Sequence, residues 1–247
     1  MKIEGVLTEA RFIQRLNRFD ALVEIGGEAH HTHVPNSGRL RELLTEGATV
    51  LVREFDNPGR KTRFGLLLAR KDGRWVSVDS SSMPNKIVHE ALTQGRFKQF
   101  CGYGEIRREV TMGSSRFDFG LFADGREYYI EVKGVSLVEG GTAYFPDAPT
   151  ERGTKHLEEL ARLKRDGKGA GVVFIVQRED ADAVRPNDRT DRPFGDALRA
   201  AREAGVGLWA YTCRIDPGAG CICIDREIPV RAEWVKPPQP SPGETGA

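Results

Sequence analysis

Short runs of alternating hydrophobic and polar positions fill the first eighty residues, as in half-buried β-strands. The pair Gly26-Gly27 predicts a tight hairpin between the second and third runs. Between the third and fourth runs, the segment SGRLRELLTEG predicts a short helix that Ser37 caps and Gly47 ends. A sixth run, RWVSVDS, either extends the sheet or leads out of it. The five strands are expected at residues 3–13, 20–26, 28–34, 48–55 and 63–71.

Three strands, a helix and two strands follow one another in the order of the OB-fold β-barrel, a common nucleic-acid platform. From about residue 80 helices alternate with strands, which predicts an α/β domain with a mixed central sheet. We expect domains over 1–82 and 83–235, then a disordered Pro/Gly-rich tail over 236–247. In the second domain, helices are expected at 85–95, 154–166 and 191–205, and strands at 105–111, 116–123, 126–135, 170–177 and 207–213.

Composition places the chain among folded proteins, since 39% of its 247 residues are hydrophobic and 30% are charged. No hydrophobic run approaches the ~18 residues of a membrane span, and the first residues lack the apolar stretch of a secretion signal. We therefore expect a cytoplasmic protein without membrane contact. The cysteines are then expected as reduced thiols at Cys101, Cys213, Cys221 and Cys223.

The net charge of +1, from 37 Lys and Arg against 36 Asp and Glu, does not by itself indicate a polyanionic partner. Bases nevertheless outnumber acids within 11–19, 53–74 and 96–116, as they do on surfaces that bind nucleic acids. Ordinary solvated strand faces would give the same distribution. On charge alone, both interpretations stay open.

Candidate chemistry is concentrated in the segment SRFDFGLFADGREYYIEVKGV, which predicts two strands joined by a turn at Asp124-Gly125. Residue 123 then pairs with residue 126, so Asp118 lies directly opposite Glu131, with Cβ atoms about 4.5–5.5 Å apart. Lys133 shares their face of the hairpin. The other face is expected to be a buried core of Phe117, Phe119, Leu121 and Ala123 against Tyr128, Ile130 and Val132.

Two carboxylates directly opposite each other repel, so a cation, a shared proton or the bases Lys133 and Arg116 must offset the repulsion. Mg²⁺ is a hard cation that suits carboxylate oxygens, and such an ion can polarise a phosphoryl oxygen and generate hydroxide. Lys133 would then orient water or neutralise the transition state. An exposed hairpin face with a surface ion pair would fit the same spacing.

Asp118, followed after the hairpin by Glu131-Val132-Lys133, resembles the D…ExK motif of the PD-(D/E)xK nuclease superfamily. The resemblance implies a nuclease-like second domain with catalytic Asp118, Glu131 and Lys133, and with Mg²⁺ or Mn²⁺ bound by Asp118 and Glu131. It also implies a third acidic ligand from the preceding helix, where Glu90 is the matching residue. Because Glu90 lies at the flank of that helix's apolar stripe, Glu109 on the next strand stays an alternative.

Nearly the whole chain except the tail is similar to the sugar fermentation stimulation protein A family. The matching segments are RFDALVEI (18–25), HVPNSGRL (33–40), PN (84–85), SRFDF (115–119), EVKGVSL (131–137) and FPDAPTERGTKHLEEL (145–160). Val34 stands where many members have cysteine, which argues against a required thiol there. The resemblance implies a DNA-binding protein with an N-terminal OB domain and a C-terminal nuclease-like domain.

Several basic and polar residues are candidates for contact with nucleic acid. The segment 145–160 predicts a loop entering a helix with bases in its first turn, an arrangement that suits a phosphate group, although the helix also packs through its leucines. The barrel loop after the third strand is a second candidate for phosphate or base contacts. The expected contacts are Arg18, His33, Asn36, Arg39, Arg60, Lys61, Arg63, Arg116, Arg152, Lys155 and His156.

These residues predict a DNA-binding protein that is a Mg²⁺- or Mn²⁺-dependent nuclease, with no small-molecule cofactor. The alternative is a non-cleaving, weakly sequence-specific DNA-binding regulator of sugar-metabolism genes. The sequence decides neither between DNA and RNA, nor between single and double strands, nor the oligomeric state. No constellation of a sugar kinase or glycosidase is present.

Overall fold

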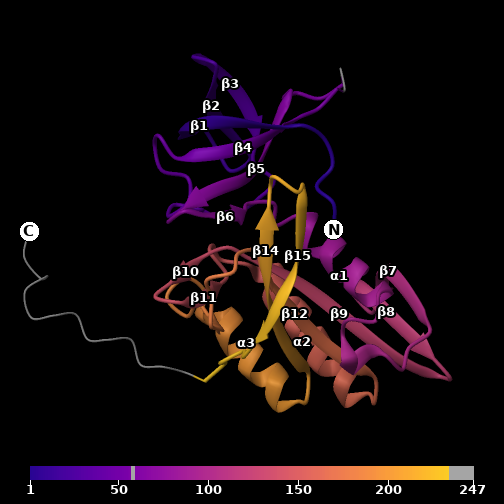
Figure 1. Cartoon of the computed structure of the whole chain (residues 1–247). Helices are drawn as coiled ribbons and strands as arrows, with labels where there is room; N and C mark the ends of the chain where they lie inside the picture. The colour runs from indigo at the N-terminus through magenta and orange to yellow at the C-terminus, as the bar shows by residue number, and fades with distance from the viewer. Residues whose placement is uncertain (57–58, 234–247) are drawn as a thin grey trace, which may run out of the picture.

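The computed structural model describes residues 1–56 and 59–233 as a barrel followed by an α/β domain (Figure 1). The first domain contains β1 (Leu7–Arg15), β2 (Asp20–Ile25), β3 (Glu28–His33), β4 (Thr49–Glu54), β5 (Phe64–Lys71) and β6 (Arg74–Ser77). The strand order is β3-β2-β1-β4-β5-β6, and a short parallel pairing of β3 with β5 closes the barrel. The expected OB barrel is confirmed, and the sixth run extends its sheet as β6.

The helix predicted over 37–47 does not form, and turns take its place. Arg15 reaches across from β1 and donates to the backbone oxygens of Gly38 at 2.7 Å and Arg39 at 2.8 Å. Leu40 has a positive φ of 52°, which interrupts a right-handed helix. Carbonyl groups that a helix would satisfy internally are therefore satisfied by a guanidinium from a distant strand.

The second domain contains a six-stranded sheet in the order β15-β14-β12-β9-β8-β7. Its strands are β7 (Glu105–Met112), β8 (Ser115–Ala123), β9 (Arg126–Val135), β12 (Gly169–Val176), β14 (Gly207–Asp216) and β15 (Cys221–Ile228). β9, β12 and β14 are parallel neighbours, whereas the other pairs are antiparallel, so the mixed sheet is confirmed. β15 and a small sheet of β10 (Val138–Glu139), β11 (Thr142–Phe145) and β13 (Ala183–Pro186) have no counterpart in the sequence prediction.

Both faces of this sheet are buried. The helices are α1 (Met83–Thr93), α2 (Glu151–Arg165) and α3 (Arg192–Glu203), with a 3₁₀ turn η1 (Lys98–Phe100) after α1. Leu160 of α2 and Phe194 of α3 pack on one face in a core with Phe174. On the other face, Ile87 of α1 and Leu67 of the barrel belong to a single core cluster. The barrel and the α/β domain therefore share a core.

Hydrogen bonds between distant segments also hold the two domains together. Gln177, which follows β12 and is fully buried, donates through Nε2 to Ser77 Oγ at 2.7 Å and to the backbone oxygen of Asp79 at 2.8 Å. Asp147 Oδ2, in the loop before α2, accepts from Leu40 N at 2.7 Å. No helix within 1–56 and 59–233 is long and apolar enough to cross a membrane. The expected tail over 236–247 lies outside the described residues.

Candidate functional site

The β8–β9 hairpin has the register that its sequence predicts. Ala123 pairs with Arg126 across the turn, and the ladder continues to Phe119 and Ile130. The ladder ends at that pair, one position short of Asp118 and Glu131. The two carboxylates lie close enough for the charge of Glu131 to act on Asp118.

β8 does not keep a regular alternation at Asp118, contrary to the prediction that Phe117 and Phe119 share a face. Phe117 packs in the core under α2, whereas Phe119 packs in the core under α1. Residues two apart on a regular strand share a face, so β8 changes face between them. On the neighbouring strand β7, Glu109 has a positive φ of 54°, and the ladder skips it between Arg108 and Val110. Asp118 is therefore left out of the regular pairing of β8 with both neighbouring strands.

Asp118 is held by two donors. Its Oδ2 accepts from the backbone N–H of Val132 at 2.7 Å, and its Oδ1 accepts from Asn85 Nδ2 of α1 at 2.6 Å. Burial and the neighbouring charge of Glu131 raise the pKa of Asp118 to about 6, against the stabilising effect of both hydrogen bonds on its charged form. The Asp118 carboxylate is therefore oriented by its two donors, but its ionised form is destabilised at neutral pH by burial and by the charge of Glu131.

Glu131 is 5% exposed and faces two cationic or titratable groups. Its Oε1 accepts from Lys133 Nζ at 2.7 Å and lies 2.5 Å from Nδ1 of the buried His156 on α2. Burial, the largest single influence, raises the pKa of Glu131, but Lys133 and His156 together outweigh it and hold that pKa below its usual value. The other oxygen, Oε2, is buried without a hydrogen-bond partner. An ionised carboxylate with an unused buried oxygen is a ready ligand for a cation.

The third acidic ligand expected from α1 or β7 is not brought to this pair. The carboxylate of Glu90 lies 2.7 Å from the N-terminal ammonium of Met1, and Glu109 lies 2.9 Å from Arg116 Nε. Each of these two carboxylates forms an ion pair with a cationic group of the protein. The described residues contain no group of three or more His, Cys, Asp or Glu side chains arranged to hold a metal. The structure thus corrects the expected role of Glu90 and does not support the alternative of Glu109. From α1 it supplies the amide of Asn85 instead.

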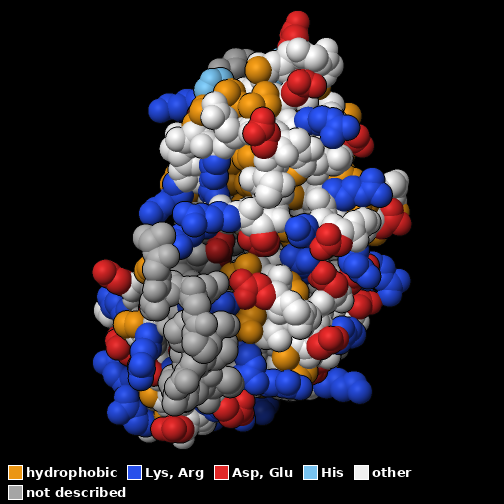
Figure 2. Space-filling model, turned by 90° about the vertical axis from the view of Figure 1, so that its left-hand side faces the viewer, with side chains coloured by type: hydrophobic (Ala, Val, Ile, Leu, Met, Phe, Trp, Pro, Cys, Tyr) orange, Lys and Arg blue, Asp and Glu red, His pale blue; other side chains and the backbone are white. Residues whose placement is uncertain are grey.

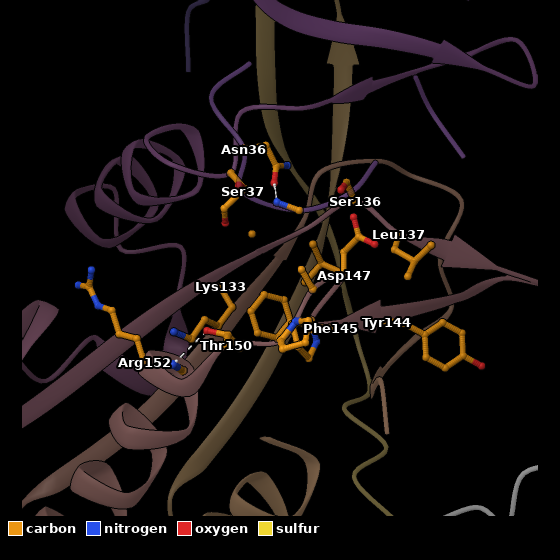
Figure 3. A pocket seen from close by; sticks show the side chains of 18 of the residues that line it. Asn36, Ser37, Lys133, Ser136, Leu137, Tyr144, Phe145, Asp147, Thr150 and Arg152 are labelled. Carbon is orange, nitrogen blue, oxygen red and sulfur yellow. Dashed lines mark hydrogen bonds between the residues drawn. The ribbon is translucent and has the colours of Figure 1, made fainter. Parts of the chain in front are cut away.

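A cleft of about 340 Å³ opens beside the carboxylates, between the barrel and the α/β domain. Figure 3 shows Asn36 and Ser37 of the barrel above this space, and Lys133 and Arg152 of the second domain below it. Glu131 and Arg18 also line the cleft. The tertiary fold therefore brings Glu131, Lys133 and a basic residue from each domain around one opening.

Only some of the expected nucleic-acid contacts reach the cleft. Arg18, Asn36 and Arg152 line it. The Asn36 amide is committed to structure, however, since Nδ2 donates to Val78 O at 2.9 Å and Oδ1 accepts from Gly38 N at 2.7 Å. Only 5% of His156 is exposed, and its ring contacts Glu131. It is therefore not the phosphate contact that the sequence predicts. Its burial under α2 makes it a partner of the carboxylate instead.

The remaining expected contacts lie away from the residues that line the cleft. Arg60 stacks on the Phe55 ring at 3.8 Å, and Arg63 is paired with Glu54. The other expected contacts outside the cleft lining are His33, Arg39, Lys61, Arg116 and Lys155. Figure 2 shows Lys and Arg side chains with acidic ones between them on one side of the molecule.

One exposed aromatic pair lies next to a cleft residue. Phe19, which is 48% exposed, follows Arg18 directly and stacks on His33 with ring centroids 6.3 Å apart. The His33 ring is fixed through Nδ1, 3.0 Å from the backbone oxygen of Phe19. Rings displayed in this way are suited to stacking on bases.

Sequence inspection does not find Asn85, Arg15 or Asp147 as parts of this region. Asn85 appears in the sequence only as a helix-starting residue, and its contact with Asp118 spans 33 positions. Asp147 and Leu40 are 107 positions apart. Contacts over such separations leave no periodic or turn signal in the chain.

Two family models match this chain: "SfsA N-terminal OB domain" over residues 13–78, and "Sugar fermentation stimulation protein RE domain" over 82–219. The chain belongs to the sugar fermentation stimulation protein family. The family resemblance seen in the sequence is thereby confirmed.

Relatives of this family match over nearly their full length. The sugar fermentation stimulation protein homolog of Acetivibrio thermocellus is 63% identical over 230 residues, covering 93% of this chain and 99% of the relative. The homolog of Clostridium tetani is 49% identical over 231 residues, with the same coverage. The solved structure of Pyrococcus furiosus SfsA in complex with Ca²⁺ is 31% identical and superposes with a TM-score of 0.84, covering 94% of this chain and 99% of that chain. The two-domain fold is thus a family property.

Proposed function

We propose that this protein is a divalent-metal-dependent nuclease that hydrolyses phosphodiester bonds of DNA in the cleft between its domains. The observation that carries the proposal is the buried Oε2 of Glu131, which has no hydrogen-bond partner and belongs to a carboxylate whose charge acts on Asp118. Two adjacent carboxylates, one kept ionised by Lys133 and His156, are suited to a hard cation such as Mg²⁺ or Mn²⁺.

Asp118 and Glu131 would hold the metal ion. Each Asp118 oxygen accepts a single hydrogen bond from the described residues, which leaves lone pairs for a cation, and Glu131 contributes its unused Oε2. The related Pyrococcus furiosus protein was solved with Ca²⁺, another cation that prefers oxygen ligands, which supports the assignment of cation type. When bound, such an ion supplies Lewis-acid polarisation of a phosphoryl oxygen and a lowered pKa of coordinated water.

The chain's own side chains would do the remaining work. Lys133, whose ammonium is 2.7 Å from Glu131 and lines the cleft, is positioned to stabilise negative charge that develops on a phosphoryl oxygen. His156 and Lys133 keep Glu131 ionised. Arg18 and Arg152, on opposite walls of the cleft, can pair with phosphates on either side of the reacting bond.

The barrel would hold the nucleic-acid strand. Phe19 and His33 present stacked rings beside Arg18, and stacking of bases on such rings does not depend on base identity. Weak sequence preference is therefore expected. The rings favour unpaired bases, because bases within a duplex are already stacked on one another.

A non-cleaving DNA-binding protein is the second candidate. The observation that favours it is that the described residues place no third acidic side chain with Asp118 and Glu131. In that case the carboxylate pair would use a cation only to hold phosphate.

Incubation of labelled single-stranded and duplex DNA with the pure protein tests the proposal, in Mg²⁺, in Mn²⁺ and in EDTA. Glu131→Gln removes the ligand charge, and Glu158→Gln is the control because Glu158 is an exposed carboxylate of α2. Metal-dependent cleavage that is lost only in Glu131→Gln supports the nuclease. Binding without cleavage in every metal overturns it in favour of the second candidate.

A further inference from the structure

A second cavity, of about 190 Å³, lies against the first half of α1 and the N-terminal residues. Four basic side chains line it, from four separate parts of the chain: Lys2, Arg53, Lys86 and Arg108. We call this cavity the N-terminal basic pocket. Its one acidic lining residue is Glu4, so Lys and Arg outnumber Asp and Glu in the lining by four to one.

The charges in this pocket are not neutralised by the protein. In the described part of the chain, no ion pair involves Lys2, Lys86, Arg53 or Arg108, and the N-terminal ammonium of Met1 is already paired with Glu90. Arg53 is the most constrained of the four bases. Its guanidinium lies 4.6 Å from the centroid of the Phe55 ring, and its Nε is buried without a hydrogen-bond partner. Clustered cations with an unmet guanidinium donor are suited to an anion with several acceptor oxygens.

α1 and β7 connect this pocket with Asp118. On α1, Asn85 donates to Asp118, and the next residue, Lys86, lines the pocket. On β7, Arg108 pairs with Phe119, the neighbour of Asp118, and His89 stacks on the same phenylalanine at 6.1 Å. Pro84, also of α1, lies against Gly134, which lines the cleft. α1 therefore contacts both Asp118 and a residue that lines the cleft, and it also lines the pocket.

We propose that the N-terminal basic pocket binds a phosphate group of the nucleic-acid strand. The choice of ligand rests on the proposed function, because a strand that passes over Asp118 with phosphates at Arg18 and Arg152 would reach Lys86 and Arg108 next. Phosphates of one strand would then be held both in the cleft and in the pocket. Inorganic phosphate offers the same chemistry and is the other possible source of the anion.

The test removes two of the charges and keeps the fold. Lys86 and Arg108 are exposed, so Lys86→Gln with Arg108→Gln is expected to fold normally, with an unchanged melting temperature. The matched control is Arg96→Gln with Lys98→Gln, which removes two exposed bases beyond the other end of α1. Binding of fluorescent oligothymidylate is followed by anisotropy in EDTA, where cleavage does not occur, from 50 to 200 mM salt. A parallel calorimetric titration uses inorganic phosphate.

For single strands, each lost phosphate contact lowers the slope of log K against log salt by about 0.7. Because the pocket is proposed to hold one phosphate, we expect the slope of the double variant to fall by about 0.7, with roughly 5-fold weaker binding at 0.1 M salt, and no change in the control. Phosphate binding lost only in the double variant, with oligonucleotide binding intact, would support the pocket with a free anion as its source. Equal slopes and equal phosphate binding in wild type and both variants overturn the proposal. The EDTA measurement keeps this outcome separate from the nuclease proposal, because it does not depend on cleavage.

Discussion

Replacement of Asp118 by asparagine should stabilise the protein at neutral pH. Burial and the charge of Glu131 raise the pKa of Asp118 from 3.8 to about 6. Between these two values the folded state holds a proton that the unfolded state has lost. Stability therefore falls as the pH rises through this window, and the full penalty is present above pH 6.

The size of the effect follows from the pKa values. A rise of roughly two pH units corresponds to about 3 kcal/mol of unfavourable free energy for the ionised carboxylate. The amide in Asp118→Asn keeps an acceptor for the Val132 N–H, and its NH₂ group can donate to Asn85 once that amide turns over. Most hydrogen bonding survives, so a net gain of about 2 kcal/mol is expected at pH 7.5.

Urea unfolding in EDTA, from pH 4 to pH 7.5, measures this difference. The stability of Asp118→Asn relative to wild type should grow with pH up to about pH 6.5 and then level off. Glu158→Gln serves as the control, since Glu158 is an exposed carboxylate remote from the pair. Addition of millimolar Mg²⁺ should stabilise the wild type and leave Asp118→Asn unchanged, because the cation would relieve the same repulsion.

A stability difference that stays constant from pH 4 to pH 7.5 would refute this reasoning. It would mean that Asp118 titrates alike in the folded and unfolded states, and hence that Glu131 and burial do not perturb it. A variant less stable than wild type at every pH would show that the two hydrogen bonds outweigh the repulsion.

Three other perturbations test the architecture around the site. Gln177→Leu removes the buried donors to Ser77 Oγ and the Asp79 carbonyl and should lower the free energy of unfolding by about 2–3 kcal/mol in urea. Gly38→Ala would place Cβ 2.9 Å from Asp147 Oδ2, so a loss of about 1–3 kcal/mol is expected, and it should shrink in an Asp147→Ala background. Phe19→Ala should weaken single-stranded DNA binding by about 1–3 kcal/mol without changing the melting temperature, because its ring is 48% exposed.

Each of these outcomes has a clear contrary result. An unchanged urea midpoint for Gln177→Leu would mean that the buried amide adds nothing between the domains. If Gly38→Ala is equally harmful with and without Asp147, the contact is not the cause. If Phe19→Ala weakens single-stranded and duplex DNA alike, the ring is not a stacking platform for unpaired bases.

Local signals in the sequence account for the barrel strands and for the carboxylate hairpin. Asp124-Gly125 permits the tight turn that joins β8 and β9, and Asp124 has the positive φ of 48° that such turns need. With the turn in place, the register runs as far as Phe119 and Ile130, which brings Asp118 and Glu131 to the end of the ladder. The family resemblance was likewise contained in contiguous segments. These features need only neighbouring residues.

The tertiary structure decided what surrounds that pair. The predicted helix over 37–47 does not form, because Arg15 donates hydrogen bonds to its backbone carbonyls. Glu90 does not reach the site, because its carboxylate pairs with the N-terminal ammonium. His156 is a buried partner of Glu131 and not a phosphate contact. Each of these outcomes depends on a group far away in the chain, and neither propensity nor periodicity records such pairings. The sequence by itself determined the register of the carboxylate hairpin, and only the packing of α1, α2 and the barrel around the sheet decided which side chains contact Asp118 and Glu131, the cleft beside Glu131 and the pKa values of the pair.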